Sequence, residues 1–347
     1  MQKVTFQSLH KAAKTGELKI FPRIKLSNAT LSAKDGSDWT PMHYAAEYGN
    51  LKFLPGEFLS EELLTLPDSH GITPLHLAAE NDHLDHIPRN LLTQKNMLME
   101  DDLKITPLHL ALGSKHANLL PKSLITEENL IRADANGLTS IHRAAESGNL
   151  NRIKKFLTSK NLLSQDKSGN TALHYAATSG NIRQLPEAVL LEGISIYNNT
   201  EESWLCLAAV RGHLDQVPKS AFFHPEWNKD GYSQIIPRKK YPLIWHAARN
   251  SQLDQVPKEA ITEAALLTHA WSYTPRPKNA INALGFAVDN GQVDYLLGME
   301  LSEAVIPIVG EEWYMRNLDV IKEIKRTKAD AEQLRTYDFH DTCEIDM

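Results

Sequence analysis

The chain has 347 residues, 42% of them hydrophobic, and a formal net charge of −6. This charge does not suggest a polyanionic partner and argues against a nucleic-acid-binding protein. The only two cysteines, Cys206 and Cys343, lie far apart, so a disulfide framework is excluded and a reducing compartment is favoured. Residues 1–21 lack the apolar stretch of a signal peptide, and no run approaches 18 apolar residues. We therefore expect a cytoplasmic protein that does not bind membranes.

A histidine returns every 33 residues through the first half of the chain. Residues 73–79 read TPLHLAA and residues 106–111 read TPLHLA, so the flanking residues recur with it. A fixed period of this size indicates one supersecondary unit that is copied and stacked. We call these residues the ladder histidines; they are His10, His43, His76, His109 and His142, followed after 32 residues by His174.

The first half of each unit predicts a short helix. Threonine is a good N-cap and proline is tolerated at the first helical position, so Thr73-Pro74 predicts a helix start. The paired alanines leave little side-chain volume, which lets neighbouring helices approach closely. A glycine then ends the helix where a left-handed residue is needed, at Gly49, Gly148, Gly180, Gly212 and Gly291.

The second half of each unit carries a proline. A proline inside a helix costs about 3 kcal/mol, so one helix cannot run through it. A second capping signal, a hydroxyl residue that acidic residues often follow, comes about five residues later at Ser60, Thr93, Thr126 and Thr262. We predict a second helix split into two short pieces, the first of which begins at the proline. These prolines are Pro22, Pro55, Pro88, Pro121, Pro186, Pro218 and Pro257.

The turn followed by Thr-Pro-Leu-His, Ala-Ala and glycine resembles the ankyrin repeat, in a variant form because of the split second helix. The resemblance implies an all-α helical solenoid with short β-turn hairpins. The alanine step predicts about nine units within residues 1–309, the last three degenerate, with hairpin insertions at 229–240 and 268–280. Residues 310–336 predict a C-terminal capping helix, and residues 337–347 an acidic tail.

The fifteen histidines do not predict a metal site. Stacked helices lie about 8–10 Å apart, whereas two ligands of one zinc ion must lie within about 4 Å of each other. We predict that the ladder histidines bond to backbone groups of adjacent turns. The chain also has no nucleophile elbow, zinc-protease motif, phosphate-binding loop or Cys-x-x-Cys. We therefore expect neither an enzyme nor a cofactor.

The resemblance implies that the hairpins and the exposed end of the first helix contact a partner. The residue before the threonine has two interpretations, partner contact or packing along the hairpins. For Trp39 with Tyr48 we favour partner contact, because Trp and Tyr are common interface anchors. Mapped onto this chain, these positions are Trp39, Ile72, Ile105 and Leu138 before the threonine, and Glu47, Tyr48, Glu80, Asn81 and Glu146 after the alanines.

The two insertions also place cationic and aromatic residues on long loops. They either contact a partner or only fill out degenerate repeats. The candidates are Tyr232, Arg238, Lys239, Trp271 and Tyr273.

These expectations describe a monomeric, non-enzymatic scaffold or adaptor that binds a protein partner along a concave groove. The alternative is a secreted bacterial effector that binds a host protein in the host cytosol through the same repeats.

Overall fold

The computed structural model describes residues 6–20, 26–224, 243–261, 266, 283–296, 319–320 and 322. These residues form helices and loops without strands, apart from isolated bridges such as Ala133–Thr139. They group into two compact units, Met1–Val189 (unit 1) and Leu190–Met347 (unit 2). None of the helices within these ranges is long and apolar enough to cross a membrane. The all-α prediction is confirmed, whereas the hairpin insertions, the tail and all but residues 319, 320 and 322 of the predicted capping helix lie outside the described residues.

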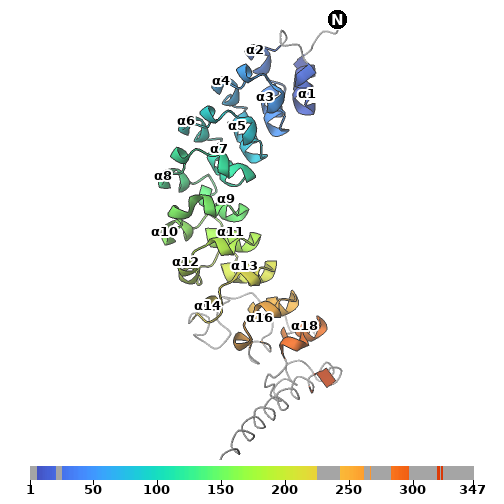
Figure 1. Cartoon of the computed structure of the whole chain (residues 1–347), viewed down its shortest axis with the longest axis vertical. Helices are drawn as coiled ribbons and strands as arrows, with labels where there is room; N and C mark the ends of the chain where they lie inside the picture. The colour runs from blue at the N-terminus through green and yellow to red at the C-terminus, as the bar shows by residue number, and fades with distance from the viewer. Residues whose placement is uncertain are drawn as a thin grey trace, which may run out of the picture. The chain divides into compact units, whose positions relative to one another are not determined.

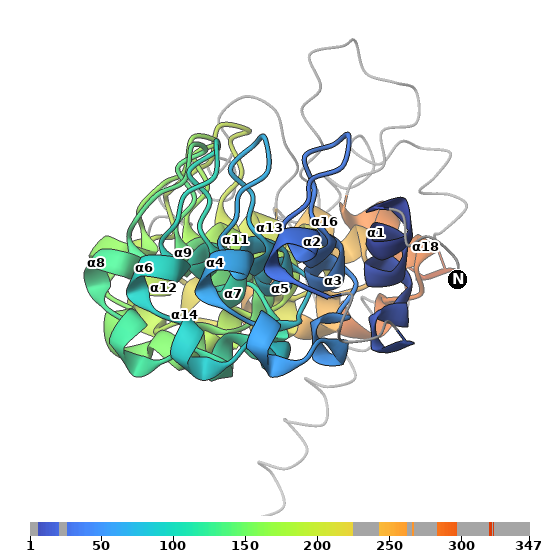
Figure 2. The ribbon, with the colours of Figure 1, turned by 90° about the horizontal axis from the view of Figure 1, so that it is seen from above.

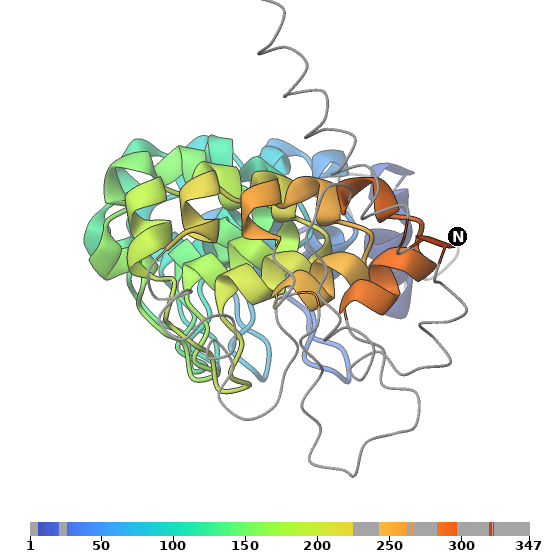
Figure 3. The ribbon, with the colours of Figure 1, turned by 90° about the horizontal axis from the view of Figure 1, so that it is seen from below.

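Unit 1 is built from two rows of short helices (Figure 1). Each first-row helix packs against the next one along the chain. The first row consists of α1 (Phe6–Thr15), α3 (Pro41–Glu47), α5 (Pro74–Glu80), α7 (Pro107–Leu112), α9 (Ser140–Ser147) and α11 (Ala172–Ser179). The second row holds α2 (Asn28–Leu31), α4 (Glu61–Leu64), α6 (Gln94–Met97), α8 (Glu127–Leu130) and α10 (Ser159–Leu162). The hairpins that precede the first-row helices all project from the same side of the two helix rows (Figures 2 and 3).

The first-row helices α3, α5 and α7 begin as predicted, at a threonine cap followed by proline. Thr40 is extended, its hydroxyl accepts the N–H of His43, and Pro41 takes a first-turn position. The Thr40 N–H in turn donates to Nδ1 of His43 (3.1 Å), so histidine plays the part that Glu or Gln plays in an ordinary capping box. The same reciprocal box stands at Thr73, Thr106, Thr139 and Thr171.

The other ring nitrogen of four ladder histidines, His43, His76, His109 and His142, bonds to a backbone carbonyl further along the chain. Because Nδ1 of His43 accepts an N–H, its Nε2 carries the proton and donates to the carbonyl of Ile72 (3.0 Å). His76, His109 and His142 do the same with Ile105, Arg132 and Ser164. The prediction that ladder histidines join neighbouring units through the backbone is confirmed.

Alanine pairs and side-chain amides complete the seam between first-row helices. Ala144 and Ala145 are fully buried, as are the alanine pairs of α3, α5 and α11. The Asn181 amide donates to the carbonyls of Ala145 (3.2 Å) and Glu146 (2.8 Å), the last turn of the preceding helix. Gly148 has φ +75°, and a Cβ there would lie 2.7 Å from Oδ1 of Asn181. Glycine is therefore required both by the left-handed turn and by the approaching amide.

The second row differs from the prediction at its prolines. Pro55, Pro88 and Pro121 do not begin a helix; each is the extended residue before a 3-10 turn. A further 3-10 turn precedes the proline, as at η3 (Leu51–Phe53) and η5 (Leu84–His86), and the capped α-helix follows. The turns after the prolines are η4 (Gly56–Phe58), η6 (Arg89–Leu91) and η8 (Lys122–Leu124). The predicted caps at Ser60, Thr93 and Thr126 are confirmed.

One repeat of unit 1 keeps the break without a proline. In η9 (Leu150–Phe156), Lys154 stands where the repeat period places proline, and Ile153 is non-helical with φ −119° and ψ 24°. Residues that precede proline elsewhere are extended, for example Ile87 with ψ 128°. Since proline favours an extended ψ in the residue before it, the ψ of 24° at Ile153 is disfavoured before a proline at 154. The split is thus a property of the repeat and not of proline alone.

Unit 2 contains three first-row helices among its described residues, and these pack in order. Trp204 is fully buried, and its indole N–H donates to the Leu190 carbonyl (3.2 Å). The helices are α13 (Trp204–Arg211), α16 (Leu243–Arg249) and α18 (Ala283–Asp289). Smaller elements are η11 (Leu214–Gln216), α14 (Lys219–Phe222), η12 (Leu253–Gln255), η13 (Lys258–Ala260) and η14 (Val293–Tyr295).

Candidate partner-binding face

An aspartate at the start of each hairpin in unit 1 fixes its loop. Oδ1 of Asp68 accepts the backbone N–H of His70 (2.8 Å) and of Ile72 (3.0 Å), and the Asp68 N–H donates to the Ile72 carbonyl (2.9 Å). Such side-chain-to-backbone bonds are the usual way in which Asp shapes a turn. The same arrangement recurs at Asp35, Asp101, Asp134 and Asp166.

The second carboxylate oxygen ties three of these hairpins to their own first-row helix. Tyr44 donates to Asp35 (2.9 Å), Tyr175 to Asp166 (2.6 Å), and the Arg143 guanidinium lies 3.4 Å from Asp134. These helix residues directly follow the ladder histidine in the sequence. We did not predict this position; the only signal for it is its place in the repeat, because its residue type changes from Tyr to Leu to Arg.

These bonds also perturb titrating groups. Burial and the bond to Asp35 raise the pKa of Tyr44 to about 12. Burial opposes ionisation of Asp35, but bonds from Ser37, Tyr44 and Trp39 together lower its pKa. Both groups are therefore held in the ordinary charge state of neutral pH, which suits a structural bond and not acid–base catalysis.

Trp39 has folding contacts that its sequence position did not reveal. Its indole N–H donates to Oδ2 of Asp68 in the next hairpin (3.0 Å). The ring stacks on His43 at 5.8 Å and meets Tyr44 edge-on at 5.0 Å. Trp39 is half-buried, so part of the ring remains open, but replacing it would also remove contacts between repeats.

The aliphatic residues before the threonines share one environment. Ile72, Ile105 and Leu138 are each half-buried. The carbonyls of Ile72 and Ile105 accept hydrogen bonds from ladder histidines, which hold the backbone in place. Part of each aliphatic side chain remains exposed. Leu110 of α7 is half-buried as well.

The predicted residues after the alanines lie one turn further along the first-row helices. Tyr48 is 44% exposed, and the Lys14 ammonium lies 5.2 Å from its ring centroid. Glu80, Asn81 and Glu146 are exposed and Glu47 is half-buried. Because residues three and four apart share a helix face, Glu47 and Tyr48 lie on the same side of α3 as Tyr44.

Together these residues form what we call the repeat face of unit 1. It consists of the hairpin bases, the residues after the ladder histidines, and the first-row helix ends. Its members are Trp39, Ile72, Ile105, Leu138, Tyr44, Leu110, Glu47, Tyr48, Glu80, Asn81 and Glu146. The other predicted residues, Tyr232, Arg238, Lys239, Trp271 and Tyr273, lie outside the described residues.

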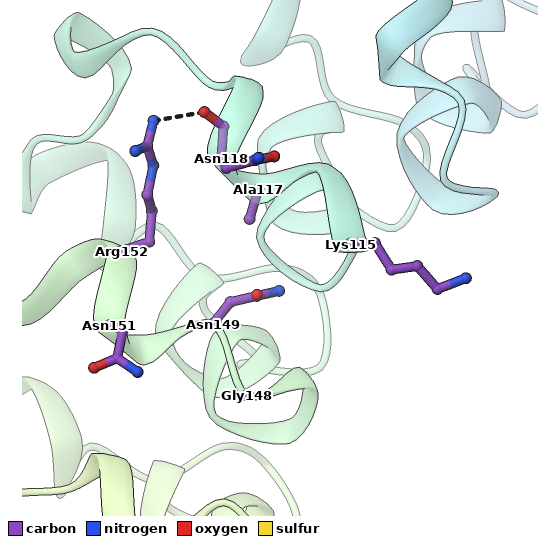
Figure 4. A pocket seen from close by; sticks show the side chains of 7 residues that line it. All are labelled: Lys115, Ala117, Asn118, Gly148, Asn149, Asn151 and Arg152. Carbon is purple, nitrogen blue, oxygen red and sulfur yellow. Dashed lines mark hydrogen bonds between the residues drawn. The ribbon is translucent and has the colours of Figure 1, made fainter.

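A shallow hollow of about 410 Å³ opens at the junction of the repeats that contain α7 and α9 (Figure 4). The guanidinium of Arg152, which lines the hollow, donates to the carbonyls of Asn118 (2.9 Å) and Leu120 (2.8 Å). Asn149 donates to the carbonyls of Leu112 and Ser114, and Lys115 points away toward Asp82. The Arg152 and Asn149 side chains of this hollow therefore hold two repeats together.

Within the described residues, histidines outside the ladder do not form a metal site either. His83 and His86 stack at 5.5 Å, and Nε2 of His86 lies 3.7 Å from Asp85. Across the described ranges, no group of three or more histidine, cysteine or carboxylate side chains could hold a metal ion.

Comparison with known proteins gives a family. The family model described as ankyrin repeats (three copies) matches residues 9–92, 120–196 and 141–219. No curated protein matches the chain. The matched residues make up more than half of the chain and contain the capped helices and hairpins described above, except α7 and the hairpin before it. The chain therefore belongs to the ankyrin-repeat family.

Proposed function

We propose that the chain is a non-enzymatic scaffold or adaptor whose protein partner docks on the repeat face of unit 1. Ankyrin repeats generally mediate protein–protein interactions, which supports the class of function. The choice of face rests on one observation: half-exposed aliphatic side chains recur at the same repeat position, on a backbone that ladder bonds hold at Ile72 and Ile105 and that Asp134 holds at Leu138.

Rigidity of the hairpins supports docking on this face. The Asp102 N–H donates to the His70 carbonyl (2.9 Å), Ala135 to Leu103 (2.7 Å) and Lys167 to Asn136 (2.9 Å). Successive hairpin tips are thereby bonded to one another. A preformed surface loses little conformational entropy when it binds, so few strong contacts suffice for affinity.

Capture from a native lysate tests the proposal. The variant Ile72→Arg/Ile105→Arg places two charges on the face, where the long side chains can extend into solvent. The matched control, Ser123→Arg/Asn151→Arg, adds the same charge at exposed positions in the second row. We expect partner recovery to fall by about tenfold or more for the first variant only, a loss of about 1.4 kcal/mol. Equal recovery by both variants, with unchanged melting curves, would contradict the proposal.

The effector alternative uses the same face and differs only in the source of the partner. The identity of the captured protein would separate the two.

A further inference from the structure

Three glutamates occupy one position of the repeat at the C-terminal ends of first-row helices. Glu47 and Glu80 are the last residues of α3 and α5, and Glu146 is the last but one of α9. Each glutamate comes three residues after the residue that directly follows the ladder histidine, and residues three apart share a helix face. All three carboxylates therefore lie at the edge of the repeat face. We call them the glutamate row.

Folding does not explain these carboxylates. Other acidic side chains of unit 1 pair from one repeat to the next, as Glu61 does with Lys95, Glu100 with Arg132 (3.1 Å) and Asp82 with Lys115 (3.3 Å). None of the three glutamate carboxylates forms an ion pair or hydrogen bond within the described part of the chain. A carboxylate at a helix C-terminus also opposes the helix dipole, which favours cations there.

The repeat face combines charged and apolar side chains. Its hairpins carry charges of both signs, with the exposed Lys34, Lys104 and Lys167 among a larger number of aspartates such as Asp102, which lies 3.7 Å from His70. The half-buried aliphatic residues form the middle, and the glutamate row forms the opposite border. An occupant that matches this order has apolar residues flanked on one side by cations.

We infer that the partner presents a basic amphipathic segment, with lysines or arginines on the glutamate row and apolar side chains on Ile72, Ile105 and Leu138. The inference rests on the proposed function and adds the chemistry of the partner to it. Packed helices lie about 8–10 Å apart. Seven residues of a helix rise about 10.5 Å. One cation at every seventh residue of a helical segment therefore has nearly the same spacing as successive first-row helices.

The helix α7 offers a direct test, because it lacks the glutamate. Gly113 stands at the corresponding position, four residues after His109, and its φ of −81° is open to any residue. A Cβ at 113 would lie 3.2 Å from the Leu110 carbonyl and 3.6 Å from the Ser147 hydroxyl, so only a small adjustment is needed. Gly113→Glu extends the row, and Gly113→Gln is the matched control with the same shape and no charge.

The experiment measures fluorescence anisotropy of a labelled 21-residue peptide that carries arginine and leucine at seven-residue spacing. We expect Gly113→Glu to bind the peptide about two- to fivefold more tightly than Gly113→Gln, the range for an exposed ion pair. Glu47→Gln/Glu80→Gln is expected to bind several-fold more weakly than the unchanged chain. Glu127→Gln/Glu128→Gln changes the net charge equally on exposed residues of α8 and is expected to have no effect.

Two results would overturn the inference: equal binding by the two Gly113 variants, or equal weakening by the α8 pair, which would indicate unspecific attraction to an acidic protein. Its failure is distinguishable from failure of the proposed function. If Ile72→Arg/Ile105→Arg abolishes partner capture while the glutamate row affects neither probe nor partner, the docking face stands and the basic segment is wrong.

Discussion

The two units hold their first-row helices together in different ways. In unit 1, ladder histidines join a threonine cap to a backbone carbonyl further along the chain, as His43 does between Thr40 and Ile72. In unit 2, Cys206 and Trp245 stand at the ladder positions. There the contact is aromatic, with the Trp245 and Phe286 rings edge-to-face at 5.0 Å.

The amide at the helix end is common to both units. Asn181 caps the last turn of α9, and Asn250 donates in the same way to the Ala209 carbonyl (3.0 Å) and the Val210 carbonyl (3.3 Å). Helix-to-helix packing therefore does not require histidine. What histidine adds is a hydrogen bond from the threonine cap to the following repeat, as His43 makes to the Ile72 carbonyl, and the repeat face proposed for partner binding lies on these repeats of unit 1.

Acidification should give the largest difference in stability between the two units. Burial lowers the pKa of His43, His76, His109 and His142 below that of unfolded histidine, about 6.5. As the pH falls below 6.5, these histidines bind protons in the unfolded chain before they do so in the folded chain. Their contribution to the free energy of unfolding is therefore present above pH 6.5 and is lost as the pH falls below it. Each such proton contributes about 1.4 kcal/mol per pH unit.

Hydrogen exchange of the full chain at pH 7.5 and 5.5, corrected for intrinsic rates, would measure this effect. We expect protection in α3, α5, α7 and α9 to fall far more than in α13 and α16. Equal losses in both units would show that the ladder histidines are not the cause.

The substitution His142→Ala should have the next largest effect. It leaves the Thr139 N–H and the Ser164 carbonyl without their partner and opens a cavity, at a cost of about 2–4 kcal/mol. Cys206→Ala, at the same repeat position in unit 2, removes one half-buried sulfur and should cost about 1 kcal/mol or less. Urea unfolding of both variants gives the comparison, and similar costs would argue against the histidine bridge.

The amide caps should instead behave alike in both units. Asn181→Ala and Asn250→Ala each remove two hydrogen bonds to helix-end carbonyls, so we expect about 1–2 kcal/mol from each. The same urea titrations test this. A large cost in one unit only would mean that the amide is not the shared element.

Proline replacement should have the smallest effect. Pro88 and Pro257 are extended residues before 3-10 turns, and the break persists at Ile153, where no proline follows. We expect Pro88→Ala and Pro257→Ala to cost about 0.4–1 kcal/mol each, through the entropy of the unfolded chain. A loss of several kcal/mol, or circular dichroism showing more helix, would indicate that proline itself causes the split.

The parts of the fold that were predictable are those whose chemistry is local. The Thr-Pro start and the histidine bonds follow from residues three apart that recur with the period. The proline offset was not predictable, because a φ near −60° suits both the first helical residue and the extended residue before a turn.

The candidate face was predictable only in part. Its hairpin and helix-end positions follow from the resemblance to ankyrin repeats. The bond from Trp39 to Asp68 spans 29 residues and joins two repeats, so no local pattern reveals it. The contacts of Tyr44, Arg143 and Tyr175 with hairpin aspartates were missed because their residue types differ.

Hydrogen exchange of the complex with the captured partner tests docking on the repeat face most directly. We predict new protection at residues 70–72, 103–105 and 136–138 and at the C-terminal turns of α5 and α9, with second-row turns unchanged. Protection confined to the second row or to unit 2 would contradict the account.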